Sequence, residues 1–349
     1  MRRLRILVYV CFAMLSVPTW AAYPAGALQG FVEVNGVHLQ YLDWGGTGPA
    51  VIFVHGLGDD PHAFDDFAPA LIDRFHVLAY ARRGSGSSDQ KGPYDLRTLT
   101  EDLREFMQAL KLDKAVLVGY SAGGEEITEL AVEDPQRVDK LVYLDAAYDW
   151  SGESFKELLR ALPKSFFSPP TEAMRSLEAF RSYLHATMFS DVKDMSRLEA
   201  YVRARVLMQP DGSVKYRISK ETVEALYAAL ESNKARDYRS IRCPALAVYA
   251  TTLYDLKSPE GRERMELANF EQAYWRPFQV QSLAHLRREL RDVQVARLSG
   301  THSSFLLTNR TNAAHIIREF LLGRSSTVGL AGCADSAEAA AASGGACLP

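Results

Sequence analysis

A serine with close glycine neighbours lies at the centre of the segment Gly119-Tyr120-Ser121-Ala122-Gly123. An apolar run, residues 115–118, comes immediately before it, and a helical pattern follows it. A tight turn from strand to helix would expose the serine hydroxyl, and Gly119 and Gly123 would remove the side chains that such a turn crowds. The positive end of the following helix would favour an oxyanion beside the serine. The predicted chemistry is nucleophilic catalysis by Ser121.

A base must take the proton of a serine hydroxyl before the oxygen becomes a strong nucleophile. Among the eight histidines, His302 is the one that follows a strand-like run late in the chain, residues 293–298. Loops that follow parallel strands gather at one edge of a sheet, so His302 and Ser121 are expected at the same edge. This placement makes His302 the predicted general base.

An oxyanion that forms during acyl transfer needs backbone N–H groups that point at it. The apolar run 50–54 is followed by a loop that begins with His55 and Gly56, and the glycine would let this loop approach the serine. The N–H groups of Leu57 and Ala122 are the predicted donors, whereas His55 is expected to be structural. The sequence predicts no metal site and no cofactor.

A third group must orient the histidine, and two aspartates are candidates for this acid. Asp145 directly follows the apolar run 141–144. A carboxylate at the end of a buried strand needs a partner, which a histidine N–H would supply. Asp255 lies in the loop after the run 245–250 and could bend round to the same edge. Asp145 is the first choice and Asp255 the alternative.

Apolar strands alternate with helical patterns along the chain, which predicts an α/β protein with a mostly parallel sheet and helices on both faces. Glu125 and Glu126 are expected in the first turn of the helix after Ser121, where the helix dipole favours them. Residues 23–147 and 242–323 are predicted to form this core. The expected strands are 50–54, 76–81, 115–118, 141–144, 245–250 and 293–298, after a hairpin over 31–44. The other expected helices are 60–71, 96–110 and 312–322.

Residues 148–241 interrupt this alternation, because no strand-like pattern occurs in them. We expect them to form a helical cap, inserted between two strands, that covers the serine. Aromatic residues are frequent in this segment and would line an apolar pocket beneath it. The expected cap helices are 154–162, 171–187, 195–208 and 220–232.

The first 22 residues have the three parts of a secretory signal peptide. Three arginines precede an apolar run over 6–17, and small residues follow it. This pattern predicts a periplasmic or secreted protein with no stable membrane anchor after cleavage. Residues 324–349 form a tail rich in Gly, Ala and Ser that is predicted to be flexible, and its Cys333 and Cys347 could pair in an oxidising compartment.

The composition narrows the possible partners. Hydrophobic residues make up 47% of the 349 residues and charged residues 24%, which is typical of a globular protein with a large core. The net charge is −3, and acidic and basic residues are interspersed without a basic patch. Nucleic-acid binding is therefore not expected, and a small molecule is the predicted substrate.

The chain resembles a known family in the order and spacing of four motifs, which are His55-Gly56, Arg83–Ser88, Gly119–Gly123 and Gly300-Thr301-His302. On these motifs it is similar to the α/β-hydrolase-fold serine hydrolases from Phe31 to Leu322, with the cap inserted after the sixth strand. The resemblance implies a Ser–His–acid triad. The chain departs from the family at the usual place of the acid, after the seventh strand, where it has Leu253. Some members carry the acid after the sixth strand instead.

The motifs and the resemblance together predict a cofactor-independent serine hydrolase that forms an acyl-enzyme. The expected substrate is a carboxylic ester of small or medium size, because an ester needs the least help with its leaving group. An amidase, an aminopeptidase or a hydrolase of carbon–carbon bonds is the alternative on the same triad, since the fold does not choose among these. A non-catalytic binding protein is the alternative of another class.

Overall fold

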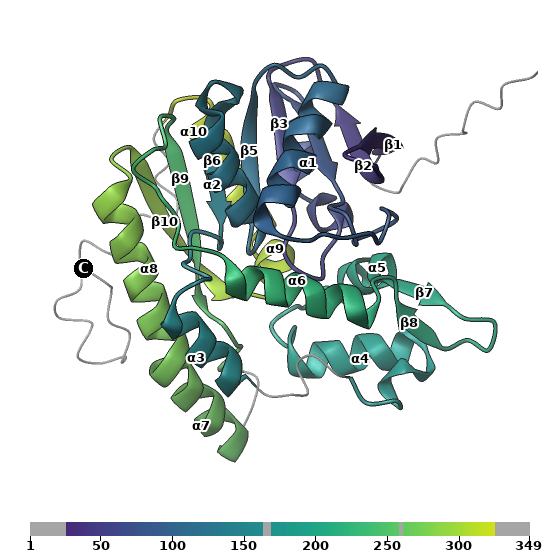
Figure 1. Cartoon of the computed structure of the whole chain (residues 1–349). Helices are drawn as coiled ribbons and strands as arrows, with labels where there is room; N and C mark the ends of the chain where they lie inside the picture. Colours follow the sequence, from purple (N-terminus) through teal and green to yellow (C-terminus); the bar gives the residue numbers. More distant parts are fainter. Residues whose placement is uncertain (1–25, 163–168, 258–260, 325–349) are drawn as a thin grey trace, which may run out of the picture.

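An eight-stranded sheet forms the centre of the structure (Figure 1). The structure is a computed structural model, and it describes residues 26–162, 169–257 and 261–324. The pairings of β1 with β2 and of β2 with β4 are antiparallel, and all other pairings are parallel. The predicted mostly parallel sheet is confirmed. In spatial order the strands are β1 (Leu28–Val34), β2 (Val37–Gly45), β4 (His76–Tyr80), β3 (Ala50–Val54), β5 (Ala115–Tyr120), β6 (Val138–Leu144), β9 (Ala245–Thr252) and β10 (Val293–Thr301).

Helices cover both faces of the sheet, because successive side chains of each buried strand point to opposite sides. In β3, Ile52 and Val54 belong to one apolar cluster, and Val51 and Phe53 belong to the other. The first cluster includes side chains of α1 (Leu96–Ala109), α2 (Gly123–Glu133) and α8 (Arg276–Glu289). The second cluster includes side chains of α9 (Phe305–Thr308) and α10 (Arg310–Leu321).

The helix expected over 60–71 is wrong, because this segment forms two short 3₁₀ turns instead. They are η1 (Pro61–Phe64) and η2 (Ala68–Ala70). A proline lacks the backbone N–H of a helical hydrogen bond, and its ring clashes with the preceding turn. Pro69 therefore stops a continuous helix, while the apolar side chains of the segment still pack against the sheet.

A long helical segment between β9 and β10 was missing from the sequence-based elements. It consists of α7 (Gly261–Phe270), a π-helical turn η6 (Glu271–Trp275) and α8. The buried face of α8 carries Gln279 and Ser282 among its apolar residues, so the apolar stripe that indicates a helix is weak in the sequence. This segment brings Trp275 to the ring of His302, and Gln279 to Tyr148 and the end of β9.

The described residues of the cap, which are 148–162 and 169–241, lie together beyond the end of the sheet at which β5 and β6 terminate (Figure 1). The cap also holds a short antiparallel hairpin of β7 (Val206–Met208) and β8 (Val214–Tyr216), so the expected absence of strands is wrong. The turn Pro210-Asp211-Gly212 allows the hairpin to form. Gly212 has a φ of 85°, and Asp211 accepts a hydrogen bond from the Ser213 N–H. The cap helices are α3 (Glu153–Ala161), α4 (Leu177–Thr187), α5 (Met195–Arg205) and α6 (Lys220–Ser232), with a 3₁₀ turn η5 (Ala173–Arg175).

The predicted signal peptide, 1–22, and all but Arg324 of the predicted tail, 324–349, lie outside the described residues. The proposed pairing of Cys333 with Cys347 therefore lies outside them as well. Within the described ranges, no helix combines the length and the apolar character needed to cross a membrane.

Candidate active site

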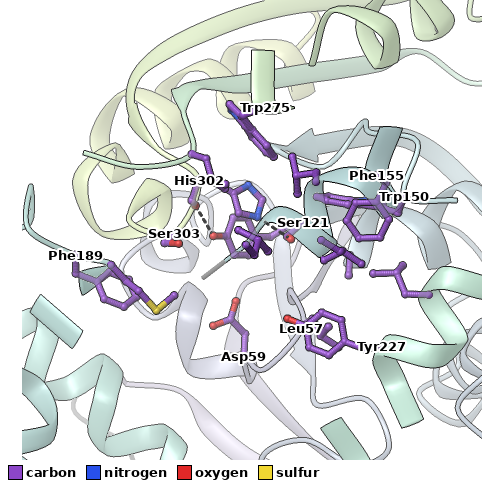
Figure 2. A pocket seen from close by; sticks show the side chains of 18 of the residues that line it. Leu57, Asp59, Ser121, Trp150, Phe155, Phe189, Tyr227, Trp275, His302 and Ser303 are labelled. Atoms are coloured by element: carbon purple, nitrogen blue, oxygen red, sulfur yellow. Dashed lines mark hydrogen bonds between the residues drawn. The ribbon is translucent and has the colours of Figure 1, made fainter. Parts of the chain in front are cut away.

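The turn between β5 and α2 exposes Ser121, which has a left-handed backbone with a φ of 51°. The glycines on both sides of this turn stand against backbone atoms. A Cβ at Gly119 would lie 2.8 Å from the carbonyl carbon of Gly123, and a Cβ at Gly123 would lie 2.3 Å from the Val54 oxygen. Both positions therefore exclude any side chain, and the turn brings the serine hydroxyl into a cavity (Figure 2).

Three predicted side chains form a hydrogen-bonded row at this edge of the sheet. Ser121 Oγ lies 3.0 Å from His302 Nε2, and His302 Nδ1 lies 2.7 Å from Asp145 Oδ2. A carboxylate oxygen only accepts, so Nδ1 is the nitrogen that donates and Nε2 is left to accept from the serine hydroxyl. This is the geometry that a nucleophile, a base and an orienting acid require.

The fully buried Asp145 carboxylate has two further donors besides His302. Its Oδ1 accepts from the Tyr148 hydroxyl and, at 2.9 Å, from the Ala250 N–H. Gln279 Nε2 in turn donates to the Tyr148 oxygen at 2.9 Å. Burial, together with the adjacent carboxylate, raises the pKa of Tyr148 well above its usual range, so this hydroxyl keeps its proton and donates. Sequence reasoning missed Tyr148 and Gln279, because no local pattern marks them.

The other candidate acid, Asp255, contacts different partners. Its oxygens accept from Ser190 Oγ at 3.0 Å and from the Lys257 N–H at 2.8 Å. The structure thus brings Asp145, and not Asp255, to the histidine ring.

The loop that carries Asp255 is held from the other side by Glu271. One oxygen of this buried carboxyl accepts from the N–H groups of Leu253 and Tyr254, at 2.5 Å and 2.6 Å. Burial raises the pKa of Glu271 to about 7, although the two N–H donors act in the opposite direction. Leu253, at the place where an acid was looked for, has its side chain in the cavity wall instead.

The two predicted oxyanion donors lie at the cavity beside the serine. Leu57 and Ala122 both line the cavity, and in the described part of the chain neither of their N–H groups has a hydrogen-bond partner. A Cβ at Gly56 would lie 3.2 Å from the Ser121 Cβ, so this glycine lets the loop come close to the serine. Two such N–H groups at this place can donate hydrogen bonds to an oxygen on which negative charge develops.

The ring of His55 is fully buried and does not line the cavity. Its Nδ1 lies 2.8 Å from the Gly56 oxygen, and its Nε2 accepts from the Arg82 N–H at 3.2 Å. Burial, with the neighbouring Arg82 charge, lowers the pKa of His55 well below its usual range. The neutral ring therefore fixes the start of the loop that carries Leu57.

Two buried ion pairs lie behind the serine turn, where the sequence indicated only acidic residues favoured by a helix dipole. Glu126 pairs with Arg82 at 2.6 Å, and Glu125 pairs with Arg236 of the cap at 2.5 Å. Burial raises the pKa of both carboxyl groups, and the guanidinium groups oppose that shift. The Glu125 pair joins the core to the segment by which the chain leaves the cap.

Tyr120, the residue before the serine, holds the histidine loop. Its hydroxyl donates to the His302 carbonyl oxygen at 2.6 Å, and the two rings stack with their centroids 5.7 Å apart. The Trp275 ring, at the end of the π-helical turn, lies 5.6 Å from the same imidazole. Aromatic rings thus restrict the motion of the base.

A cavity of about 150 Å³ lies between the serine and the cap. One side is apolar, with side chains of α3 and α6 such as Phe155, Leu158 and Leu230. The other side is lined by Phe189, Tyr201 and further residues near α5. A cavity of this volume has room for a group about the size of benzene.

No cluster of three or more His, Cys, Asp or Glu side chains among the described residues could hold a metal ion. Cys243 lies at the start of β9, remote from the cavity lining, and burial raises the pKa of its thiol to about 11. The thiol of Cys243 therefore takes no part at the cavity, where Ser121 and His302 lie.

Residues 49–252, more than half of the chain, match the α/β hydrolase fold family. The chain belongs to the α/β-hydrolase-fold family. The resemblance predicted from the four motifs is thereby confirmed.

Curated relatives match parts of this hydrolase. Uncharacterized proteins of Mycobacterium bovis and Mycobacterium tuberculosis are 31% identical over 102 residues, which cover 29% of this chain and 30% of theirs. The 2-(acetamidomethylene)succinate hydrolase of Mesorhizobium japonicum is 27% identical over 221 residues, which cover 58% of this chain and 70% of that protein. The chain thus aligns with less than a third of the mycobacterial relatives.

A crystal structure of E-2-(acetamidomethylene)succinate hydrolase has the same fold. It superimposes with a TM-score of 0.68 and 19% sequence identity, covering 84% of this chain and 99% of that one. At this identity the likeness establishes the fold and not the substrate.

Proposed function

We propose that this protein is a serine hydrolase that cleaves a carboxylic ester, or a related acyl bond, of a small or medium apolar substrate. One observation carries the proposal. The row Ser121–His302–Asp145 lies at a mostly apolar cavity, next to two backbone N–H groups that have no hydrogen-bond partner among the described residues. A nucleophile, a base, an orienting acid and an oxyanion site are the parts that acyl transfer needs.

The geometry supports a sequence of proton and acyl transfers. Ser121 Oγ attacks the substrate carbonyl while His302 Nε2 takes the hydroxyl proton. Asp145 holds the imidazole through Nδ1 and stabilises the positive charge that forms on it. The N–H groups of Leu57 and Ala122 bind the tetrahedral oxyanion. The imidazolium then protonates the leaving group, and a water activated by the same histidine hydrolyses the acyl-enzyme.

The cavity supports the substrate class. Most of its lining is apolar or aromatic, which suits an apolar group of small or medium size. An ester is preferred because its alcohol leaves more readily than an amine. The hydrolase of Mesorhizobium japonicum acts, by its name, on a compound with an acetamido group, which supports an amide bond as the second candidate.

The test of this function is the substitution Ser121→Ala. We expect kcat on a panel of p-nitrophenyl acyl esters to fall by several orders of magnitude, as loss of a triad member usually causes, with unchanged folding. A fluorophosphonate should label the native protein at Ser121. Retention of more than about a tenth of the activity would contradict the mechanism. A native protein that takes up no label would favour the binding-protein alternative.

We further propose that the protein is exported to the periplasm or the medium. The support is the sequence of residues 1–22, with arginines, an apolar run and small residues in the order of a signal peptide. Mass spectrometry of the exported fraction should find a chain that begins at Ala22 or Tyr23. An intact Met1 on active protein in the cytosol would contradict export.

A further inference from the structure

A second carboxylate, besides that of Asp145, reaches the cavity. Asp59 follows the oxyanion residue Leu57 by two positions, and a turn from the Gly56 oxygen to the Asp59 N–H carries it round. The side chain is 7% exposed, and Figure 2 shows it pointing into the cavity below Ser121. The serine mechanism proposed above assigns no role to this carboxylate.

The two oxygens of Asp59 have different surroundings. Oδ1 accepts from the Tyr201 hydroxyl at 2.6 Å and from Arg205 Nε and Nη2 at 3.1 Å and 2.5 Å. Among the described residues, no group donates to Oδ2. A Cβ at Gly56 would lie 2.9 Å from Oδ2 and 3.2 Å from the Ser121 Cβ, so this oxygen faces the space beside the serine. A carboxylate oxygen has two lone-pair positions, and those of Oδ2 are therefore available to a ligand.

Arg205 makes this carboxylate compatible with acyl transfer. A lone negative charge near the oxyanion site would oppose the negative charge that forms there. The buried guanidinium of Arg205 is bound to Oδ1 and lies 3.3 Å from the Tyr201 ring centroid, so it offsets the charge of the carboxylate. One oxygen fastens the cap to the core, and the other remains a hydrogen-bond acceptor inside the cavity.

We propose that Asp59 Oδ2 accepts a hydrogen bond from a hydroxyl or protonated amine of the substrate, an inference that rests on the serine hydrolase function proposed above. The substrate then has two unlike parts. An apolar part lies against α3 and α6, and a part that carries a hydrogen-bond donor lies on the side of Phe189 and Tyr201 (Figure 2). A carboxylate on that second part would meet Asp59 and be rejected, because like charges repel and neither oxygen could donate.

The test uses matched esters that differ only at one end. One set is 2-hydroxyethyl, propyl and carboxymethyl butyrate, which vary the alcohol. The other set is the p-nitrophenyl esters of 6-hydroxyhexanoate, heptanoate and adipate, which vary the acyl chain. In one of the two sets we expect kcat/KM to be about tenfold higher for the hydroxyl ester than for its methyl counterpart, and about tenfold lower for the carboxylate, as a hydrogen bond to a charged group allows. The set that responds shows which end faces Asp59.

Asp59→Asn tests the residue itself. The Asn oxygen can still accept from Tyr201 and Arg205, while its amide N–H groups would replace Oδ2 and donate into the cavity. In this variant we expect the hydroxyl ester and its methyl counterpart to have equal kcat/KM. The kcat/KM of the carboxylate ester should rise relative to that of the hydroxyl ester. Asp73→Asn is the matched control, because Asp73 also pairs with an arginine, Arg318, at the surface. The control should keep the wild-type ratios.

The outcomes separate this inference from the function on which it rests. No hydrolysis in either set and no fluorophosphonate labelling of Ser121 would contradict the hydrolase function. Hydrolysis with equal kcat/KM within both sets would overturn the role of Asp59 and leave it as a link between core and cap. The wild-type ratios decide this even if Asp59→Asn fails to fold.

Discussion

The loops after β6 and β9 leave neighbouring parallel strands at the same edge, yet they serve the site differently. After β6 the chain turns at once, and Asp145 offers its carboxylate to His302. After β9 the backbone is held by Glu271, and Leu253 packs its side chain into the cavity wall. Of these two loops, the one after β6 therefore supplies the carboxylate that contacts His302, although both begin at the same edge of the sheet.

The largest effect is expected from removing the charge of the Asp145 carboxylate. Asp145→Asn should lower kcat by about 10⁴-fold, because the amide would hold the imidazole in the wrong tautomer. The measurement is the hydrolysis of a p-nitrophenyl ester on protein with a native melting temperature. Asp255→Asn is the matched control and should stay within about twofold, since its oxygens bind Ser190 and Lys257. A large loss in Asp255→Asn with little loss in Asp145→Asn would reverse the assignment.

Glu271, which holds the loop after β9, should make the stability of the folded protein depend on pH. The pKa of Glu271 in the folded state, about 7, is above its ordinary value of 4.5. The folded protein thus holds this proton more tightly than the unfolded chain, so the stabilisation is complete below pH 4.5 and is lost as the pH rises to about 7. The loss corresponds to about 3 kcal/mol.

Glu271→Gln isolates this contribution, because the amide oxygen can still accept from Leu253 and Tyr254 but does not titrate. Urea unfolding of both proteins at several pH values gives the difference in unfolding free energy, in which other titrating groups cancel. We expect that difference to change between pH 4.5 and 7 and to be constant below this window. A constant difference throughout would mean that Glu271 is not buried with a raised pKa.

A smaller effect is expected from Tyr148→Phe. The substitution keeps the ring packing with Trp275 and Phe278 and removes one of the donors to Asp145. The loss of a hydrogen bond to a charged group should lower kcat by roughly tenfold. KM should be unchanged, because the hydroxyl contacts the acid and not the cavity. A change confined to KM would instead indicate that the hydroxyl acts on substrate binding and not through the acid.

Much of the core could be predicted because its signals are local. The apolar strands, the glycines around Ser121 and the spacing of His302 from its strand are all visible in short windows of sequence. Because β5, β6, β9 and β10 are parallel, the loops at their carboxyl ends lie at one edge, which brings the serine and the histidine together.

The features that the sequence did not predict depend on contacts between distant parts of the chain. Asp145 and Asp255 both follow strands, and only the folded loops show which one meets His302. Glu125 and Glu126 look like surface residues of a first helical turn, yet each is buried against an arginine distant in sequence. α8 escaped detection because its buried face carries polar side chains that find partners only in the tertiary structure.

The left-handed backbone at Ser121 is shared by Asp145, whose φ is 45°. For residues other than glycine this conformation costs about 1 kcal/mol or more at each position. Two members of the row are therefore held in place by the surrounding packing against their own local preference. A glycine at either position would relieve that cost and abolish the chemistry, so selection for thermal stability alone would drive this site toward inactivity.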